Sequence, residues 1–450
     1  MSKKPSLQSP GTRETKELLK NSPQQGWVEL VQKYGKTFVY QGSLATCDPV
    51  VVQKLLMNRS HTRKRSAVYK LMSRIIPGAP GVLFMDGKEW HKHVQAVMPV
   101  FTKAHVEAQA RTIHETVMTR VQDWPDGQPL HDLFQAVTEI GLRVVLKVGY
   151  GLDPDQEVAA RFGYEFMDYK RKTMTATARL DEFGFSWDQL SQLPAFIRER
   201  RELRKQVNRQ QGLVTQIMEE RRQNNHQGHD WISLMSKGGF SLSEVTDELN
   251  HIYGAFNAID YAITCGLYEI SKQPDWAKRI RDELNSVLGD RDYPTRDDFD
   301  QLPDTIHFMK EVFRYYPVAI AVMRRTGEPL PVEGGEWPTD QEVLILLQSM
   351  HHHPDYWDEP EVFNPDRWRH PLREPQAYIP FLTGPRQCIG RHLAELHFVV
   401  TLNAILRHAD IQVLDHDVPL LPYLIPRFAK AIPFQMHTLQ PHAEPTVRKA

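Results

Sequence analysis

Cys388 stands out among the residues that could carry chemistry, because two glycines bracket it in the segment Gly384-Pro-Arg-Gln-Cys388-Ile-Gly390. Glycine permits positive φ angles and close approach of the backbone, so Gly384 and Gly390 predict a tight loop. Apolar residues recur with helical spacing over residues 393–406, which places Cys388 just before a helix N-terminus. Free N–H groups and the positive end of the helix dipole stabilise an anionic sulfur there. The segment therefore predicts a loop that presents a thiolate to a metal, with Arg386 as a cation for the thiolate or for a cofactor carboxylate.

No second cysteine stands near Cys388, which excludes a zinc ribbon or an iron–sulfur cluster. A lone cysteine is usually a small buried residue. Here, however, the frame Phe381-x-x-Gly384-x-Arg386-x-Cys388-x-Gly390 resembles the haem-binding signature of the cytochrome P-450 superfamily, with every fixed position filled. The resemblance implies that Cys388 is the proximal thiolate ligand of a haem b, the ligand that favours O–O cleavage.

Composition narrows the class of protein. The chain has 450 residues, 41% of them apolar and 25% charged, which is typical of a globular enzyme domain. A net charge of −1 argues against a nucleic-acid-binding protein. Three scattered cysteines predict a reducing compartment, and no run approaches the length of a membrane span. Family members from eukaryotes usually carry a membrane anchor, so we expect a soluble, bacterial-type form located in the cytoplasm.

The resemblance predicts a mainly α-helical fold with a minor β-sheet region. It covers about residues 30–435, so we expect one cytochrome P-450 domain over 16–440 with flexible tails at 1–15 and 441–450. The early residues predict a short strand pair near 37–47, followed by a helix that Asp48 caps. Ser241 predicts the N-cap of a long helix that continues to Ile270 and ends before Pro274.

Three residues resemble the haem-propionate contacts of the family. Trp90 matches the tryptophan whose indole N–H meets a propionate, and Arg324 and Arg386 match propionate-binding arginines. The usual basic residue four positions after the tryptophan is Val94 in this chain. We therefore expect either that a residue of the segment 91–93 compensates or that the propionate is held differently.

A second motif supports the assignment. Glu311 and Arg314 are three residues apart on a predicted helix, so their side chains share one face and can pair. Such a pair is common, but Pro317 follows it and the pair precedes the Cys388 loop by about seventy residues, as in the Glu-x-x-Arg motif of the family. The resemblance implies that Arg367 completes a buried ion network, which braces the proximal side.

The long helix departs from the family at the oxygen site. Most oxygen-activating members carry an acid followed by Thr, which deliver protons to bound O2. Here these two positions are Asn257 and Ala258. Asn can direct a hydrogen bond but cannot shuttle a proton as a carboxyl does. Asp260 lies one turn further and could help, or it could face a neighbouring helix.

Three functions remain open on these grounds. The leading one is a monooxygenase that hydroxylates an apolar small molecule, with electrons from a separate ferredoxin or flavodoxin-type donor docked near Cys388. The second is an enzyme that isomerises or dehydrates a lipid peroxide and needs no electrons. The third is a haem sensor or carrier without turnover, for which the bulk of Phe256 is the only indication. We expect the substrate pocket to be bounded by Ala255, Phe256, Ile320 and Ala321.

Overall fold

The computed structural model describes most of the chain, in the residue ranges given at the end of this paragraph. The predicted tail 441–450 lies outside the described residues. The first helix begins at Thr12, inside the predicted N-terminal tail. The described residues are 7–21, 23–62, 66–67, 69–70, 73, 76–78, 81–165, 167–168, 172, 193–224, 228–421 and 426–439.

Helices dominate these residues, which confirms the prediction of a mainly α fold. Among the described residues, no helix is both long enough and apolar enough to cross a membrane. The α-helices are α1 (Thr12–Asn21), α2 (Pro23–Tyr34), α3 (Pro49–Met57), α4 (Arg59–Thr62), α6 (Gly87–Val97), α7 (Lys103–Glu107), α8 (Ala110–Val121), α9 (Leu133–Val144), α11 (Leu193–Gln223), α12 (Trp231–Lys237), α13 (Leu242–Lys272), α14 (Pro274–Leu288), α15 (Pro303–Tyr315), α16 (Leu347–His351) and α17 (Arg391–Leu406).

The strands form small sheets. In the largest, the order is β1-β2-β6-β3, where β1 and β2 form an antiparallel hairpin, β2 and β6 are parallel, and β6 and β3 are antiparallel. The strand pair predicted near residues 37–47 is therefore confirmed. The strands are β1 (Thr37–Tyr40), β2 (Ser43–Thr46), β3 (Val322–Arg325), β4 (Leu330–Val332), β5 (Gly335–Trp337), β6 (Glu342–Ile345), β7 (Ala409–Val413), β8 (Leu420–Leu421), β9 (Arg427–Phe428) and β10 (Phe434–Thr438).

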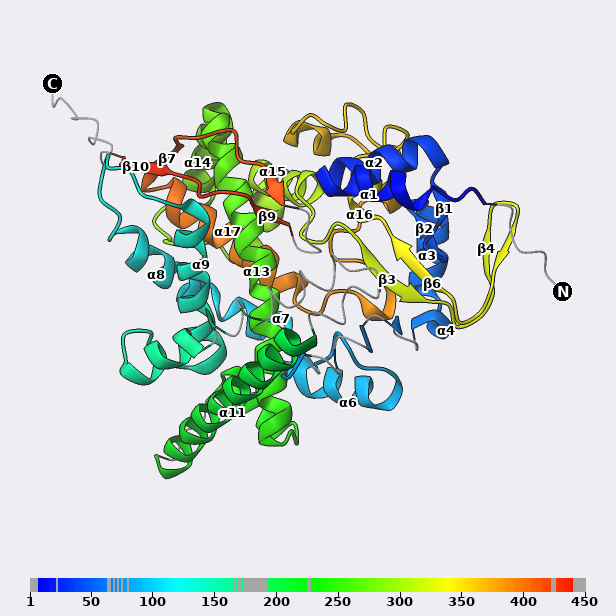
Figure 1. Cartoon of the computed structure of the whole chain (residues 1–450). Coiled ribbons are helices and arrows are strands. Elements are labelled where there is room, and N and C mark those ends of the chain that lie inside the picture. Colours follow the sequence, from blue (N-terminus) through cyan, green and yellow to red (C-terminus); the bar gives the residue numbers. More distant parts are fainter. Residues whose placement is uncertain are drawn as a thin grey trace, which may run out of the picture.

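The helix α13 runs through the middle of the molecule, with α8 and α9 to its left and the β1-β2-β6-β3 sheet to its right in Figure 1. Ser241 caps it as predicted: its hydroxyl accepts from the N–H of Glu244, whose carboxylate accepts from the Ser241 N–H. The helix ends at Lys272, and Pro274 opens α14. Most of its 31 residues are buried in the larger of two main hydrophobic cores.

The second core lies around the β1-β2-β6-β3 sheet and helices α2 and α3. The loop that carries Cys388 touches both cores. Phe381 packs edge-on against Phe313 of α15, with ring centroids 5.3 Å apart. Gly384 lies against α3, because a Cβ there would come within 2.2 Å of the Leu56 carbonyl oxygen. Helices α15 and α3 therefore hold this loop in place.

A close contact between α9 and α13 depends on Gly141. A Cβ at this position would lie 2.1 Å from Oδ1 and 2.8 Å from Cγ of Asp260, which is itself buried. Gly141→Ala therefore forces the buried Asp260 carboxyl, or the helices themselves, to shift, and we expect a loss of about 1–3 kcal/mol in the free energy of unfolding, measured by chemical denaturation.

Gly212 of α11 provides the matched control, because no atom lies within 4 Å of a Cβ placed there. Gly212→Ala should stabilise the protein slightly, by up to about 1 kcal/mol, since alanine is the better helix former. Equal stability of the Gly141 variant and the wild type would contradict the proposed contact.

Candidate functional site

The Cys388 loop is a tight bend, as predicted. The backbone N–H of Cys388 donates to the carbonyl of Phe381 at 2.9 Å, and Gly384 has φ of +75°. That positive φ, together with the contact to α3, requires glycine at 384. Gly390 has an ordinary φ of −85° at the N-cap of α17, so of the two properties that glycine offers it does not use positive φ. A Cβ there would instead approach the Phe101 ring at 3.5 Å.

The thiol of Cys388 lies at the start of α17, where the N–H groups of Gly390 and Arg391 hydrogen-bond the sulfur and lower its pKa. Burial is the larger effect and raises the pKa of this thiol above its ordinary value. The side chain is nevertheless accessible, whereas Cys47 and Cys265 are buried. An accessible sulfur in dense surroundings faces an internal space, and it needs a positive partner there to become a thiolate.

The three predicted members of the ion network lie together. The guanidinium of Arg314 donates from Nε and Nη2 to the two carboxylate oxygens of Glu311 at 2.9 and 2.8 Å, and both side chains are fully buried. Arg367 donates from Nε to Glu311 at 3.0 Å. Arg314 also donates to the backbone carbonyls of His351 and Pro360, which joins α15 to the loop before Arg367. The network therefore crosslinks the proximal side.

Sequence reasoning missed a further donor. The indole N–H of Trp368 donates to Glu311 at 3.0 Å, and so does the backbone N–H of Asn364 at 2.8 Å. Trp368 directly follows Arg367, so the adjacency was visible in the sequence. Both carboxylate oxygens of Glu311 thus accept hydrogen bonds from arginine, tryptophan or the backbone. A buried carboxylate needs such donors because it has lost its water.

Trp90 and Arg386 are brought together. The Arg386 guanidinium stacks over the indole of Trp90, 3.9 Å from the ring centroid, and donates to the Met85 carbonyl at 3.0 Å. Burial and the nearby Arg324 lower the pKa of Arg386 to about 10, while Asp86 acts in the opposite direction. Of the two roles left open for Arg386, a carboxylate contact beside Trp90 fits this position.

Arg324 is a buried cation that lacks a carboxylate partner within the described part of the chain. It is 4% exposed, donates to the carbonyl of its neighbour Met323 at 2.9 Å, and leaves Nε without a hydrogen bond. Burial lowers the pKa of its guanidinium, and the Tyr69 hydroxyl partly offsets this. A buried, underpaired arginine beside a second arginine is a site for an anion with more than one carboxylate.

No residue of the segment 91–93 reaches this cation pair. His91 bonds the carbonyl of Gly87, Lys92 pairs with Glu244, and His93 pairs with Glu248 at 2.6 Å. Each of the three therefore has a partner of its own, and how the chain compensates for Val94 stays a prediction. Trp90, Arg324 and Arg386 are the residues predicted to hold an anion.

One face of α13 is partly accessible in the middle of this otherwise buried helix. Gly254 and Ala258 are half-buried and Ala255 is exposed, and these positions share one side at helical spacing. This accessibility is compatible with the prediction that Ala255 and Ala258 border the substrate and oxygen sites. Their small side chains leave room on this side of the helix.

The other residues predicted to bound the substrate pocket are buried. Phe256 lies between Trp231 and His397, with ring centroids at 5.9 and 5.8 Å, in the larger core. Ile320 and Ala321 are buried in the smaller core, just before β3. A buried side chain can line an enclosed pocket, so the place of these three residues in the substrate pocket stays a prediction.

Asn257 is 5% exposed, and its Oδ1 has no hydrogen-bond partner in the described residues. It lies about 100° around the helix from Ala258. Asp260 faces α9 at Gly141, so the alternative that applies to this acid is the one in which it faces a neighbouring helix. Asn257 and Ala258 therefore provide neither a carboxyl nor a hydroxyl at the two positions where the family pattern has an acid and Thr.

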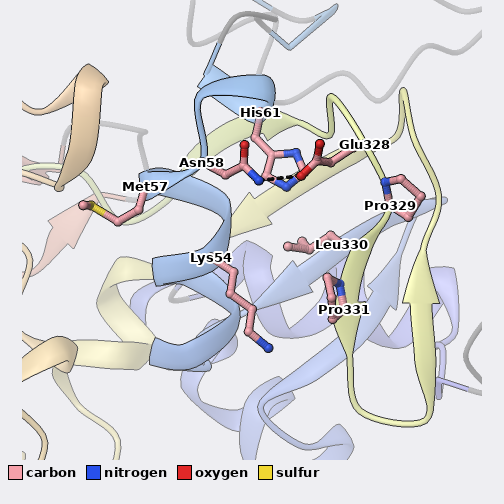
Figure 2. A pocket seen from close by; sticks show the side chains of 8 residues that line it. All are labelled: Lys54, Met57, Asn58, His61, Glu328, Pro329, Leu330 and Pro331. Atoms are coloured by element: carbon pink, nitrogen blue, oxygen red, sulfur yellow. Dashed lines mark hydrogen bonds between the residues drawn. The ribbon is translucent and has the colours of Figure 1, made fainter.

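Figure 2 shows a different cavity of about 500 Å³, between α3, α4 and the β4–β5 hairpin. In it, Asn58 donates to Glu328, and His61 accepts from the backbone N–H of Gly327 at 2.9 Å. None of the predicted site residues lines this cavity. Within the described residues, no cluster of three His, Cys, Asp or Glu could hold a metal ion.

A mainly α fold with one accessible cysteine at a helix N-terminus and a buried cation pair defines a haem-thiolate protein. A sequence model of the cytochrome P450 family matches residues 14–433, and this chain belongs to that family. The chain is 25% identical over 390 residues to human cytochrome P450 4Z1, covering 82% of this chain and 76% of the relative. It is 27% identical over 381 residues to rat cytochrome P450 4A14, with 80% and 74% covered. Human cytochrome P450 3A5 is 25% identical over 419 residues, with 84% and 80% covered.

As a cytochrome P450, the protein uses haem b as its cofactor and is an oxidoreductase of the monooxygenase type. The described residues fit that cofactor. Cys388 supplies the soft anionic ligand that iron takes in this class, and Arg324 is a buried cation without an ion pair that suits a propionate. Trp90 and Arg386, which stack on each other, suit the second propionate carboxylate.

Arg324→Met tests this assignment through two effects of opposite sign. Removing a buried, unpaired charge should raise the unfolding free energy of the haem-free protein by about 1 kcal/mol or more. Losing a charged hydrogen bond to a propionate should speed haem release about tenfold or more, measured by transfer to excess apomyoglobin.

Arg325→Met is the control, because Arg325 lies on the same strand but near Asp340 and Glu342, at 3.7 and 3.9 Å. It should leave haem release unchanged. An Arg324→Met protein that keeps its haem as long as the wild type would show that Arg324 does not hold a propionate.

Proposed function

We propose that this protein hydroxylates an apolar organic molecule with O2 and two electrons from a separate ferredoxin or flavodoxin-type donor. The single observation that supports this most is the accessible thiol of Cys388 just before α17, the helix that contacts α13 through the His397 and Phe256 rings at 5.8 Å. The overall reaction balances as RH + O2 + 2 e⁻ + 2 H⁺ giving ROH + H2O. Bound haem would supply the O2 activation in this chemistry.

The residues of the chain would divide the work as follows. Cys388 would hold the iron, whose positive charge would favour the thiolate, and the N–H groups of Gly390 and Arg391 would add hydrogen bonds to its Sγ. Trp90, Arg324 and Arg386 would orient the cofactor through its carboxylates. Ala255 and Ala258 would leave space for an apolar substrate next to the oxygen site, and the buried Glu311 network would keep the proximal side rigid.

The electron donor would dock on the proximal side near the start of α17. Arg386 is buried, so it is not available to contact the donor. Arg391 is half-exposed and pairs with Glu395 at 2.9 Å, and Arg296 pairs with the same carboxylate at 2.7 Å. These two arginines could meet an acidic donor. The cytoplasmic location stays a prediction.

The second candidate is the peroxide-using enzyme, because one observation favours it. Asn257 leaves a buried Oδ1 without a partner, and Ala258 has no polar group. A substrate that already contains the O–O bond needs neither protons nor electrons. The third candidate, a sensor or carrier without turnover, rests only on the bulk of Phe256, which lies in the larger core.

Two measurements separate the candidates. Purified ferric protein is mixed with a fatty-acid hydroperoxide and no reductant, and substrate loss is followed. Reduced protein is mixed with O2, and the oxygen complex is followed by absorption. We expect slow or no hydroperoxide turnover and a well-formed oxygen complex. Rapid rearrangement or dehydration of the hydroperoxide by the ferric protein would overturn the monooxygenase proposal.

A further inference from the structure

The accessible face of α13 extends beyond Ala255 and Ala258 towards the N-terminus of the helix. Every third or fourth residue on this side is at least partly accessible, whereas most residues on the other sides are buried. Three of its side chains can carry a proton. In order along the helix the face consists of Glu244, Asp247, His251, Gly254, Ala255 and Ala258.

Asp247 is half-buried and makes no hydrogen bond or ion pair in the described part of the chain. Burial, followed by the charges of Glu248 and Glu244, raises its pKa to about 7, and His93 partly opposes this. A carboxyl with this pKa both binds and releases protons near neutral pH. Perturbed groups of this kind concentrate at functional sites.

The neighbouring acids are occupied differently. Glu248 is fully buried and bonds His93 of α6 at 2.6 Å, which ties the two helices together. Glu244 pairs with Lys92, which together with the Ser241 N–H lowers its pKa to about 2, so it stays ionised. Asp247 is therefore the acid of this group that can exchange a proton.

His251 lies one turn further along the same face, at the i+4 position from Asp247. Gly81 packs on it, since a Cβ there would come within 2.8 Å of the His251 Cβ, and the Phe84 ring lies 6.0 Å away edge-on. Glu248 is the charged group nearest to this contact, with Oε2 at 3.1 Å from the same Cβ position. At a rise of 1.5 Å per residue, Ala258 lies about 10 Å further along the helix, a distance of a few waters.

We infer that Asp247 and His251 form the proton path to the oxygen site, doing the work that an acid and Thr do in most of the family. The Asp247 carboxyl takes a proton from solvent and passes it through a bridging water to one ring nitrogen of His251. The other ring nitrogen releases a proton to waters that span the about 10 Å along the helix to Ala258, and the imidazole returns to neutral. This inference rests on the proposed monooxygenase function.

The path matters for how oxygen is reduced. Without organic substrate, O2 + 4 e⁻ + 4 H⁺ gives 2 H2O, whereas O2 + 2 e⁻ + 2 H⁺ gives H2O2. Slow proton supply to the distal site favours the second reaction, because the reduced oxygen then leaves as H2O2 with its O–O bond unbroken. The fraction of electrons recovered as H2O2 therefore reports on the path without any need to know the substrate.

The test uses the full-length haem protein with Asp247→Asn and His251→Gln, reduced in air by a light-driven flavin. We expect each variant to raise the H2O2 fraction about twofold or more. The double variant should equal the single ones, because two members of one series path are not additive. The thiolate spectrum of the reduced carbon monoxide complex must stay unchanged, and His251→Asn replaces His251→Gln if the latter loses it.

His91→Gln is the matched control and should behave as the wild type. His91 hydrogen-bonds the Gly87 carbonyl of its own helix and lies outside the accessible face of α13. H2O2 fractions that do not change in Asp247→Asn and His251→Gln, or that change equally in His91→Gln, would overturn the path.

A second readout is independent of turnover. The His251 ring is followed by carbon-13 NMR against pH in the diamagnetic carbon monoxide form, and its signal is identified by its loss in His251→Gln. A carboxylate one turn away stabilises the imidazolium, so Asp247→Asn should lower the His251 pKa by about 0.5 or more. An unchanged titration would show that Asp247 and His251 do not interact, and it would overturn the path.

Failure of the path and failure of the proposed function are distinguishable. If the wild type reduces O2 to water and the variants do the same, only the path is wrong. If the reduced wild type forms no water from O2, while the ferric protein consumes the fatty-acid hydroperoxide, both proposals are wrong.

Discussion

Replacing Cys388 with Ala is expected to abolish the thiolate spectrum of the reduced carbon monoxide complex and to lower turnover at least about 10³-fold. The sulfur is accessible at the start of α17, where the N–H groups of Gly390 and Arg391 hydrogen-bond it. No other cysteine is accessible within the described residues. A thousandfold loss corresponds to about 4 kcal/mol of transition-state stabilisation. The absorption spectrum measures the first effect, and substrate-dependent electron consumption measures the second.

Cys47→Ala is the control for this experiment. Cys47 is also a single thiol, but it is fully buried beside the sheet, and burial raises its pKa far above the ordinary value. Its loss should leave the spectrum intact at a modest cost in stability. A Cys388→Ala protein with an unchanged thiolate spectrum would remove the ligand assignment and with it the proposed function.

Arg314→Ala should be the most destabilising single change in the chain outside the haem ligand. It leaves Glu311 as a buried carboxylate without its bidentate partner and orphans the carbonyls of His351 and Pro360. Breaking a buried pair by removing one partner costs about 3–5 kcal/mol. We expect this loss in the free energy of unfolding, and haem content after purification should fall with it.

Lys278→Ala provides the comparison, because Lys278 forms an exposed i,i+4 pair with Asp282 on α14. Such a pair contributes about 0.5 kcal/mol or less. Arg314→Lys separates charge from geometry: an ammonium keeps the charge but loses the fork of donors, so an intermediate loss is expected. Stability of Arg314→Ala within error of Lys278→Ala would show that the network does not brace the proximal side.

Local signals in the sequence predicted the helices and strands well where caps and turns mark them. Ser241 with Glu244, and Asp48 before Pro49, form the caps that their residue types indicate. Gln41 and Gly42 both take positive φ and close the predicted hairpin between β1 and β2. These features depend on neighbours within four residues, so one sequence is enough to read them.

The sequence was less informative where contacts join distant segments. Phe256 lies next to Ala255 in sequence, yet each helical step turns the side chain by about 100°, and only packing against Trp231 and His397 decides that it belongs to the core. His93 is close to Trp90, but its partner Glu248 is 155 residues away. No pattern in the chain announces that pairing.

By itself the sequence determined the class of the protein, because the spacing around Cys388, the pair Glu311–Arg314 and the order of the motifs are properties of the chain alone. Only the tertiary structure decided which side chains meet. It placed Arg324 and Arg386 together as buried cations, closed Glu311 with Trp368, and turned Asp247 and His251 to the face of α13 that leads to Ala258. The physical reason is that burial, charge pairing and accessibility are set by residues far apart in the chain, and these three quantities control the chemistry of the site.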